Sequence, residues 1–303
     1  MMQYKKRRIM PKRINKAIEL LSDDQPVFYT GSHTGANLTY EAGKTAAKTW
    51  ADYINIGMEH GAFDMAGLNN FMRGLAAGGP TNSGHLTPAV IVEMPVDGSS
   101  TDVIRANAWQ FRQVLAQGVH GILLCHAESP EAVKAFVECC RYPFQTIGVG
   151  TQLEVGRRGS AGQGSAAPIW GISADEYLGK ADPWPLNPDG ELLLGLKIEN
   201  KRALANVELT ARVPGIAFAE WGPGDMGMSF GYQRTPHPVP EELTAARNRV
   251  FAACKAAGLA FLESATPDGV GSKIDEGIRI MSGGSSGEIA TAGRDYAHRT
   301  MPV

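Results

Sequence analysis

Short apolar runs alternate along the chain with amphipathic segments, and this alternation predicts the fold. The runs are continuously apolar and rich in β-branched and aromatic residues, which is typical of parallel strands that are buried on both faces. Eight runs are predicted as strands: VFYTGS (27–32), YINIGME (53–59), AVIVEMP (89–95), GILLCHA (121–127), QTIGVGT (145–151), LLLGLKIE (192–199), GIAFAEWGP (215–223) and LAFLESA (259–265).

The intervening segments carry helix signals. The segment 129–142 opens with Ser129 as an N-cap and a proline at the first helical position, and 240–258 ends at Gly258, a favourable stop. Strands that alternate with helices over this length predict a single-domain (β/α)8 barrel spanning residues 1–303. An open doubly wound sheet is the alternative, but no GxGxxG motif follows the first strand. Residues 154–191 are rich in Gly, Pro and Ser and are predicted as a long loop.

Composition excludes several classes of protein. Hydrophobic residues make up 43% and charged residues 20% of the 303 positions, a balance that argues against disorder. The formal net charge of −2 predicts no nucleic-acid or membrane partner. The four cysteines form no CxxC pair, which favours reduced thiols and a cytoplasmic protein. The basic start, residues 1–13, is interpreted as a solvated arm, with an anion-binding tail as the alternative.

Charged residues gather where the predicted strands end, the edge at which such barrels place their active sites. Helix N-capping is the competing explanation, because each strand end leads towards a helix start. It accounts less well for a whole set of charges on one rim. The set consists of Glu59, His60, Glu93, His126, Lys197, Glu199, Asp225 and Glu263.

Glu199 and Asp225 follow neighbouring strands and are candidate ligands of a hard divalent cation such as Mg²⁺ or Mn²⁺. Caps or surface acids are the alternative reading of this spacing. The segment EWGPGDMGMSFG favours a binding site, because Gly222 and Gly224 allow the backbone to approach a ligand closely. Consecutive amides there are predicted to bind a carboxylate.

Three further side chains have both a structural and a chemical interpretation. Lys197 lies two residues before Glu199 on one strand, so both should point into the barrel as an ion pair. A Schiff-base nucleophile at Lys197 is the alternative, and it requires a depressed pKa. His60 directly follows a strand and is a candidate general base or a structural histidine. His126 is interpreted as structural.

Several motifs occur in the order of a known family: IGMEHGAFDMAGL, SPEAVKAFVECCRYP, GVG near 148–150, LKIEN and EWGPGDMGMSFGY. Together they resemble the HpcH/HpaI aldolase/citrate lyase family, in particular its metal-dependent pyruvate aldolases, from about residue 14 to residue 282. The resemblance implies a (β/α)8 barrel, a trimeric or hexameric assembly and bound Mg²⁺, Mn²⁺ or Co²⁺. It implies that Glu199 and Asp225 hold the metal and that the amides of Gly224 and Asp225 help to bind pyruvate.

The same resemblance implies the reaction. The metal acts as a Lewis acid and stabilises an enolate that forms or breaks a carbon–carbon bond to an aldehyde. His60 falls on the family's base-positioning histidine, with Glu59 beside it. Gly57 replaces the aspartate that partners this histidine, and Lys197 replaces a glutamine. Glu93 (or Met94, after a one-residue shift) replaces an arginine, and Lys197 is predicted to restore that positive charge with Glu93 balancing it.

The sequence therefore predicts a metal-dependent aldolase that acts on a 2-oxo acid and an aldehyde. Three alternatives remain open: decarboxylation of an oxaloacetate-like acid, Schiff-base catalysis through Lys197, and a diverged protein that binds metal and oxo acid without turnover. A lyase of coenzyme A esters is less favoured, because the motifs are closer to those of the aldolases.

Overall fold

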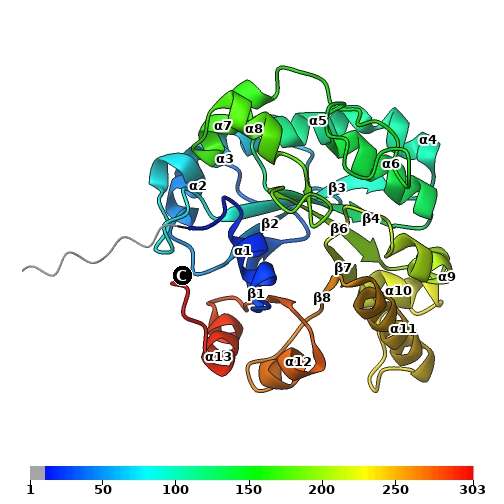
Figure 1. Ribbon diagram of the computed structural model, residues 1–303. Helices are drawn as coiled ribbons and strands as arrows, with labels where there is room; N and C mark the ends of the chain where they lie inside the picture. The colour runs from blue at the N-terminus through cyan, green and yellow to red at the C-terminus, as the bar shows by residue number, and fades with distance from the viewer. Residues whose placement is uncertain (1–10, 303) are drawn as a thin grey trace, which may run out of the picture.

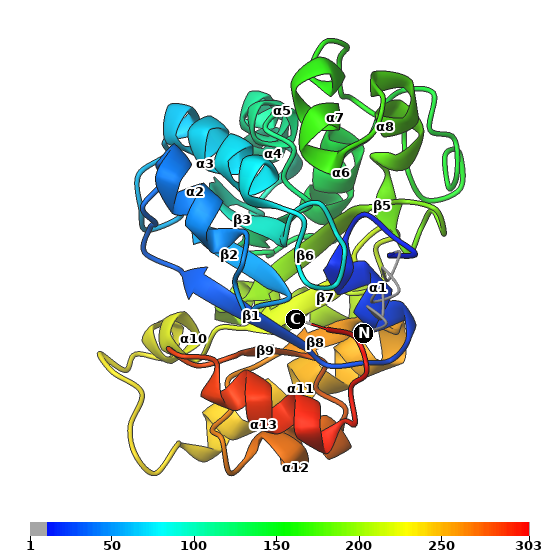
Figure 2. The same ribbon diagram turned by 90° about the vertical axis from the view of Figure 1, so that its left-hand side faces the viewer.

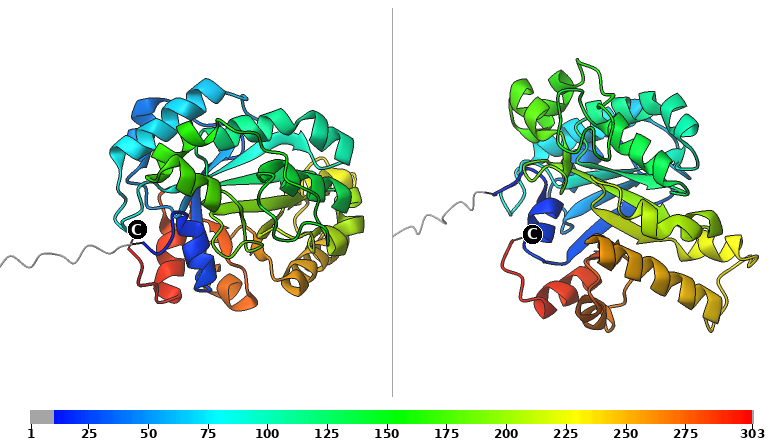
Figure 3. Two further views of the ribbon diagram at one scale, coloured as in Figure 1. Left: turned by 45° about the horizontal axis from the view of Figure 1, so that its top comes forward. Right: turned by 45° about the vertical axis from the view of Figure 1, so that its right-hand side comes forward.

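A closed barrel of parallel strands, surrounded by helices, forms the described part of the chain, residues 11–302 of the computed structural model (Figures 1 and 3). A ninth strand, β5 (Pro183–Trp184), pairs with β6 beside the barrel, which β4 and β6 close by pairing with each other. The prediction of a (β/α)8 barrel is confirmed. The barrel strands are β1 (Val27–Ser32), β2 (Tyr53–Gly57), β3 (Ala89–Asp97), β4 (Gly121–Cys125), β6 (Leu192–Ile198), β7 (Phe218–Trp221), β8 (Ala260–Leu262) and β9 (Ile280–Ser282).

Seven of the eight predicted strands are confirmed, and the one at 145–151 is wrong. That segment is a series of turns, in which Gly148 and Gly150 adopt φ values of +79° and +81° that a regular strand excludes. The missing barrel strand is β9, which pairs with both β8 and β1. It escaped prediction because only three residues are extended before two glycines follow.

Thirteen helices lie in the described residues, and none of them is long and apolar enough to cross a membrane. The predicted signals are confirmed: the Ser129 side chain caps α6, and α11 ends at Gly258 with φ +72°. The helices are α1 (Lys16–Ser22), α2 (Tyr40–Ala46), α3 (Met65–Gly78), α4 (Thr101–Ala106), α5 (Ala108–Ala116), α6 (Pro130–Cys140), α7 (Gln163–Trp170), α8 (Ala174–Lys180), α9 (Lys201–Thr210), α10 (Pro223–Ser229), α11 (Glu241–Ala257), α12 (Val270–Glu276) and α13 (Glu288–Tyr296).

The segment 154–191, predicted as a long loop, instead contains α7, α8 and β5. Ser173 and Glu176 form a capping box that starts α8, and the rings of Trp170 and Tyr177 pack 4.6 Å apart between the two helices. Figure 2 shows α7 and α8 side by side. The abundance of Gly, Pro and Ser misled the prediction, because α7 accommodates Pro168 within its eight residues. The predicted basic arm lies mostly outside the described residues.

The inside of the barrel changes from apolar to polar along its axis. At the amino ends of the strands lies α1 (Figure 1). Its side chains Ala17, Ile18 and Leu20 pack in one apolar cluster with inward side chains such as Val27 and Leu193. At the carboxyl ends, the next inward position of several strands is polar, because side chains two residues apart face the same way. The pairs are Tyr53 and Asn55, Ile91 and Glu93, Leu123 and Cys125, Gly195 and Lys197, and Phe218 and Glu220.

Asp52 joins the two ends of the described chain. It is fully buried just before β2 and forms ion pairs with Lys16 of α1 at 3.1 Å, Arg294 of α13 at 3.3 Å and Arg299 at 2.5 Å. Its carboxylate also accepts a hydrogen bond from the Phe28 amide of β1. The C-terminal segment therefore lies next to α1 (Figure 2).

Candidate functional site

Four glutamates and one lysine form the polar layer at the carboxyl ends of the barrel strands. The side chains of Glu59, Lys197 and Glu199 are 9%, 5% and 0% exposed. Glu93 and Glu220 are 0% and 7% exposed. Glu93 pairs with His33, whereas Glu59 and Glu199 share the one ammonium group of Lys197. Because buried charges are stable only when they are paired or bound to a metal, two carboxylates on one lysine leave negative charge to be balanced. The layer is therefore suited to bind a further cation.

Lys197 lies at the centre of this layer as an ion-paired ammonium group. Its Nζ atom is 2.5 Å from Glu59 Oε2 and 3.2 Å from Glu199 Oε2. Burial by itself lowers the pKa of Lys197, but the carboxyl groups around it, including Glu199 and Glu93, raise the pKa well above its usual value. Lys197 therefore carries a positive charge, which agrees with the predicted ion pair.

Glu199 is held from two sides. The backbone amide of His126 donates a hydrogen bond to Oε1 at 3.1 Å, while Oε2 accepts no hydrogen bond and meets Lys197 only as an ion pair. On the other side, a Cβ atom on Gly222 would lie 2.7 Å from Glu199 Cβ, so a glycine is required there. Burial raises the pKa of Glu199, against the opposing charge of Lys197.

The structure tests the predicted pairing of Glu199 with Asp225 only indirectly. Asp225 is half-buried in the first turn of α10, directly after Gly222 has brought that helix against Glu199. Among the described residues, the groups whose ligand atoms all lie within 4.8 Å of one another do not include Asp225. Asp225 as a metal ligand therefore stays a prediction. Gly224 faces open space, as a position for ligand approach requires.

Two groups of side chains in the described chain have the spacing of metal ligands: Glu59, Cys125 and Glu199, and His33, Glu93 and Glu220. In the first group, Glu59 Oε1 and Glu199 Oε2 are buried oxygens without a hydrogen-bond partner. Burial raises the pKa of the Cys125 thiol well above its usual value, so this sulfur is neutral and a poor ligand for a hard cation. The Glu199 carboxylate offers the oxygen donors that a hard cation such as Mg²⁺ or Mn²⁺ prefers, whereas the Glu59 carboxylate is held by Lys197.

The predicted histidine base lies at the rim of this layer. The His60 side chain is 50% exposed, and its Nε2 atom is 3.5 Å from Glu59 Oε2. Burial raises the pKa of Glu59, but the hydrogen bond and the charge of Lys197, with smaller contributions from Cys125 and His60, together outweigh this effect and lower the pKa. Glu59 thus stays ionised between Lys197 and His60.

Glu263 and His126 complete the predicted set. Glu263 pairs with Arg247 and Lys273 at 2.6 Å each, so its charge is neutralised by helices α11 and α12. His126 directs its backbone amide at Glu199, and its ring lies 3.6 Å from Glu59 Oε1. It therefore contributes to the orientation of Glu199, as a structural role predicts.

Sequence reasoning missed three polar residues of this site: His33, Asn55 and Glu220. His33 directly follows β1, and its Nδ1 atom is 2.5 Å from Glu93 Oε1. The Asn55 side chain donates to the same Glu93 oxygen at 3.0 Å. Glu220 lies beside Lys197 in the pairing of β6 with β7. Asn55 and Glu220 lie two residues after the inward-facing Tyr53 and Phe218 on the same strands. Because side chains two residues apart in a strand face the same way, this spacing would have placed both inside the barrel.

Glu220 is expected to make the stability of the protein depend on pH. Burial raises its pKa from 4.5 to about 8, and the nearby Glu93 adds to this effect. Because the pKa is higher in the folded state, stability is lost as pH rises from the unfolded value through the folded one. Glu220→Gln is therefore expected to exceed the wild type in free energy of unfolding by about 4–5 kcal/mol near pH 9, and by about 1 kcal/mol or less near pH 5. Urea unfolding in EDTA at both pH values measures this, and a difference that does not change with pH would contradict it.

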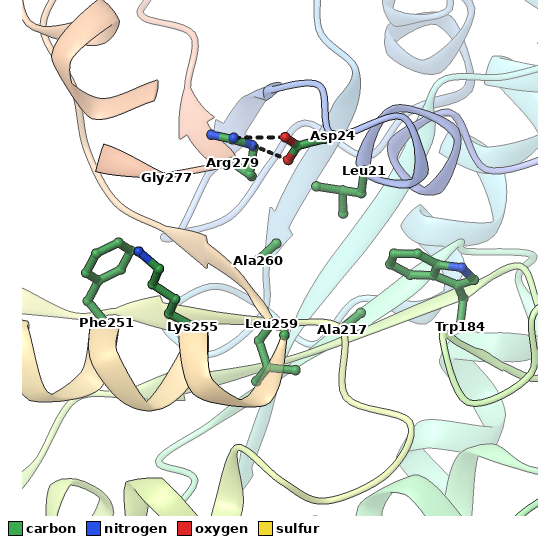
Figure 4. A pocket seen from close by; sticks show the side chains of 11 residues that line it. Leu21, Asp24, Trp184, Ala217, Phe251, Lys255, Leu259, Ala260, Gly277 and Arg279 are labelled. Carbon is green, nitrogen blue, oxygen red and sulfur yellow. Dashed lines mark hydrogen bonds and ion pairs between the residues drawn. The ribbon is translucent and has the colours of Figure 1, made fainter. Parts of the chain in front are cut away.

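A well-formed cavity of about 250 Å³ lies at the other end of the strands (Figure 4). Its lining includes Ala217 and Ala260, at the amino ends of β7 and β8, and Lys255 of α11. The one ion pair drawn there joins Arg279 to Asp24 at 2.7 Å. This cavity is separate from the buried carboxylates and takes no part in the candidate site.

Comparisons with known proteins agree with this geometry. The model of the HpcH/HpaI aldolase/citrate lyase family matches residues 89–292. A hydroxypyruvate/pyruvate aldolase of Paraburkholderia phytofirmans is 26% identical over 240 residues, which cover 79% of both chains. Another, from Pseudomonas aeruginosa, is 27% identical over 217 residues, 71% of this chain and 68% of that one. The crystal structure of an HpcH/HpaI family protein from Burkholderia cenocepacia gives a TM-score of 0.67 at 23% identity, covering 93% of this chain and 97% of that one.

The family match begins at β3 and continues to α13, so it spans most of the barrel and both Glu199 and Asp225. The structural comparison shows that the barrel fold is shared. The motifs that predicted an aldolase-type lyase are thus confirmed by independent comparisons. This protein is an enzyme of the aldolase and lyase type and belongs to the HpcH/HpaI aldolase/citrate lyase family.

Proposed function

We propose that the protein forms or cleaves the carbon–carbon bond between a pyruvate-type 2-oxo acid and an aldehyde, with a divalent metal as cofactor. The observation that carries this proposal is the buried Glu199 carboxylate, whose Oε2 atom accepts no hydrogen bond at the active-site end of an aldolase-family barrel. Two relatives named as hydroxypyruvate/pyruvate aldolases support a short 2-oxo acid as substrate. The identity of the aldehyde is not fixed by any of these residues.

Glu199 and Asp225 would hold the metal, which we propose to be Mg²⁺, Mn²⁺ or Co²⁺. The donor set supports a hard cation, because both side chains offer carboxylate oxygens. Glu59 and Glu199 share the single ammonium group of Lys197, and this supports a bound cation independently. When bound, such an ion supplies Lewis-acid polarisation of the substrate's keto oxygen.

The protein's own groups would bind and orient the oxo acid. The backbone around Gly222 and Gly224 lies at the start of α10, where amide groups point out of the helix and favour a carboxylate. The ammonium group of Lys197 is held towards the site by Glu59 and Glu199 and would stabilise negative charge on the substrate. Glu59 thus acts on the reaction by positioning Lys197.

Exchange of the pyruvate methyl protons for deuterium tests this function without knowledge of the aldehyde. We expect the wild-type protein to exchange these protons in the presence of Mg²⁺ or Mn²⁺ and to stop when EDTA is added. Proton NMR of pyruvate in D₂O measures the rate. An absence of exchange, despite Mn²⁺ binding measured by calorimetry, would contradict the proposed enolate chemistry.

Lys197 distinguishes metal-dependent catalysis from the Schiff-base alternative. A Schiff-base nucleophile must be neutral, whereas the raised pKa keeps Lys197 charged. We expect Lys197→Gln to slow the exchange by about 100-fold, because a cation near the developing negative charge is lost. Borohydride with pyruvate should leave the wild-type mass unchanged. Lys255→Gln, in the distant cavity, is the matched control; a trapped pyruvate adduct or full exchange in Lys197→Gln would contradict the expectation.

One observation favours a second candidate, the decarboxylation of an oxaloacetate-like acid. Glu93, which replaces an arginine of the family, is fully buried and bonded to His33 and Asn55, so it offers no cation to an acidic aldehyde. Decarboxylation uses the same enolate and needs no aldehyde site. Release of CO₂ from oxaloacetate in the presence of Mn²⁺, compared with aldehyde consumption, separates the two reactions.

We propose that the enzyme acts in the cytoplasm as a homo-oligomer, a trimer or hexamer, with small molecules as its other partners. Large apolar side chains on the described surface, including Trp109, Phe144 and Met228, support burial between subunits. Light scattering of the purified protein measures the number of subunits.

A further inference from the structure

His33 and Glu93 form a histidine–carboxylate pair at the mouth of the barrel. The His33 Nδ1 atom lies 2.5 Å from Glu93 Oε1, and Asn55 holds the same oxygen from below at 3.0 Å. Glu93 is fully buried, whereas the His33 side chain is 41% exposed. A buried carboxylate that orients a half-exposed imidazole leaves the other ring nitrogen directed away from the pair. That nitrogen, Nε2, lies 3.4 Å from the Tyr29 hydroxyl, which is too long for a strong hydrogen bond.

Two glycines make room for this histidine. A Cβ atom on Gly57 would lie 2.1 Å from the His33 carbonyl oxygen and 2.6 Å from its Cα atom. Any side chain at position 57 would therefore displace His33. Gly31 adopts φ +115°, and its own Cβ would lie 2.0 Å from the Asn55 carbonyl oxygen. The end of β1 thus passes close over β2 and places His33 where a side chain at position 57 would otherwise lie.

Two departures from the family pattern, at Gly57 and Glu93, therefore belong to one arrangement. The missing acid at Gly57 frees the space for His33, and the acid at Glu93 replaces a cation that would repel a charged imidazole. His60, by contrast, is half exposed and lies 3.5 Å from a Glu59 oxygen that Lys197 already occupies. The histidine with a dedicated carboxylate partner is His33.

We propose that His33, oriented by Glu93, is the general base that removes and returns the proton at the carbon next to the keto group of the substrate. The inference rests on the proposed function, because the proton belongs to a 2-oxo acid bound at the Glu199 end of the barrel.

With pyruvate as substrate, the proton is taken from the methyl group, C3. His33 Nε2 accepts one methyl proton, and the electron pair of the broken C–H bond becomes the C2–C3 double bond. The electrons of the keto double bond move to its oxygen, where the ammonium group of Lys197 would stabilise the negative charge; a bound divalent metal would supply Lewis-acid polarisation there. Reprotonation from His33, after exchange of its proton with solvent, returns pyruvate and leaves the enzyme unchanged.

His33→Asn tests this role with little change in structure. The asparagine amide can donate to Glu93 as Nδ1 does now, but it has no atom in place of Nε2. We expect the rate of pyruvate methyl exchange to fall by at least about 100-fold, while Mn²⁺ binding measured by calorimetry stays within about twofold of the wild type. His298→Asn is the matched control, because His298 is exposed near the C-terminus at φ +50°, a conformation that asparagine tolerates.

Glu93→Gln adds a readout that a purely structural pair would not change. The hydrogen bond to Glu93 raises the pKa of His33, with smaller contributions from the charges of Glu220 and, in the opposite direction, Lys197. Tyr29 and Asn55 are the other polar groups that face this pair. A base works when it is unprotonated, so exchange rises with pH through this pKa, and Glu93→Gln should move the rise to lower pH, whereas a purely structural pair would leave its position unchanged.

The outcomes separate the inference from the proposed function. Metal-dependent exchange in the wild type that persists in His33→Asn would overturn the role of His33 and leave the function intact. Wild-type protein that exchanges nothing would overturn both. Two Mn²⁺ ions per chain, one of them lost in His33→Asn, would also overturn the inference, by showing that His33, Glu93 and Glu220 bind a metal.

Discussion

Glu199→Gln is expected to abolish metal binding and enolate formation together. Glu199 is fully buried, and its Oε2 atom accepts no hydrogen bond, so this oxygen can contact a cation directly. An amide has the same shape but no charge, and it is a much weaker ligand for a hard divalent ion. We expect Mn²⁺ affinity to fall by at least about 100-fold and pyruvate methyl exchange to become undetectable. Calorimetry and proton NMR in D₂O measure the two effects.

The matched control for this prediction is Glu208→Gln. Glu208 is a half-exposed glutamate of α9 that pairs with Arg249 at 2.8 Å, outside the barrel. Its replacement should leave both measurements unchanged, because surface ion pairs contribute little. Glu199→Gln should also remain folded, since Lys197 keeps Glu59 as a buried carboxylate partner. Wild-type Mn²⁺ affinity in Glu199→Gln would show that the cofactor is held by other residues.

The barrel could be predicted from sequence because most of its strands are buried on both faces. Such strands read as continuous apolar runs, and those of β1 to β4 were recognised for this reason. Strand length and residue composition give a false indication at two places in the chain. β9 has only three extended residues, whereas 145–151 has strand-like residues but two glycines in the left-handed region. Residues 280–282 form a barrel strand because they pair with β1 and β8, and the local sequence pattern carries no information on this pairing.

The candidate site was predictable only along single strands. Lys197 and Glu199 lie two residues apart, so their common direction follows from the sequence alone. Their partnership with Glu59 depends on how β2 and β6 are placed around the closed barrel. The position of His33 depends on the backbone of Gly31, whose conformation no apolar pattern reveals. Side chains contributed by different strands therefore became neighbours only in the folded structure.

Asp52→Asn is expected to be the most destabilising single change outside the site. Asp52 is fully buried and pairs with Lys16, Arg294 and Arg299, so its replacement leaves buried cations without their counterion. Removal of one partner from a buried ion pair costs about 3–5 kcal/mol of unfolding free energy. Urea unfolding at neutral pH should show at least this loss.

The pH dependence of the loss identifies its cause. Burial raises the pKa of Asp52, but its three cationic partners outweigh that effect and hold the pKa well below its usual range. A carboxyl group whose pKa is lower in the folded state stabilises the protein above its unfolded pKa, and this contribution fades as pH falls towards the folded value. The difference between wild type and Asp52→Asn should therefore be largest near neutrality and shrink below about pH 4. Asp24→Asn, at an exposed ion pair with Arg279, is the control and should cost less than about 1 kcal/mol. Equal losses in the two variants would mean that Asp52 is not the charge that holds α1 and the C-terminal segment together.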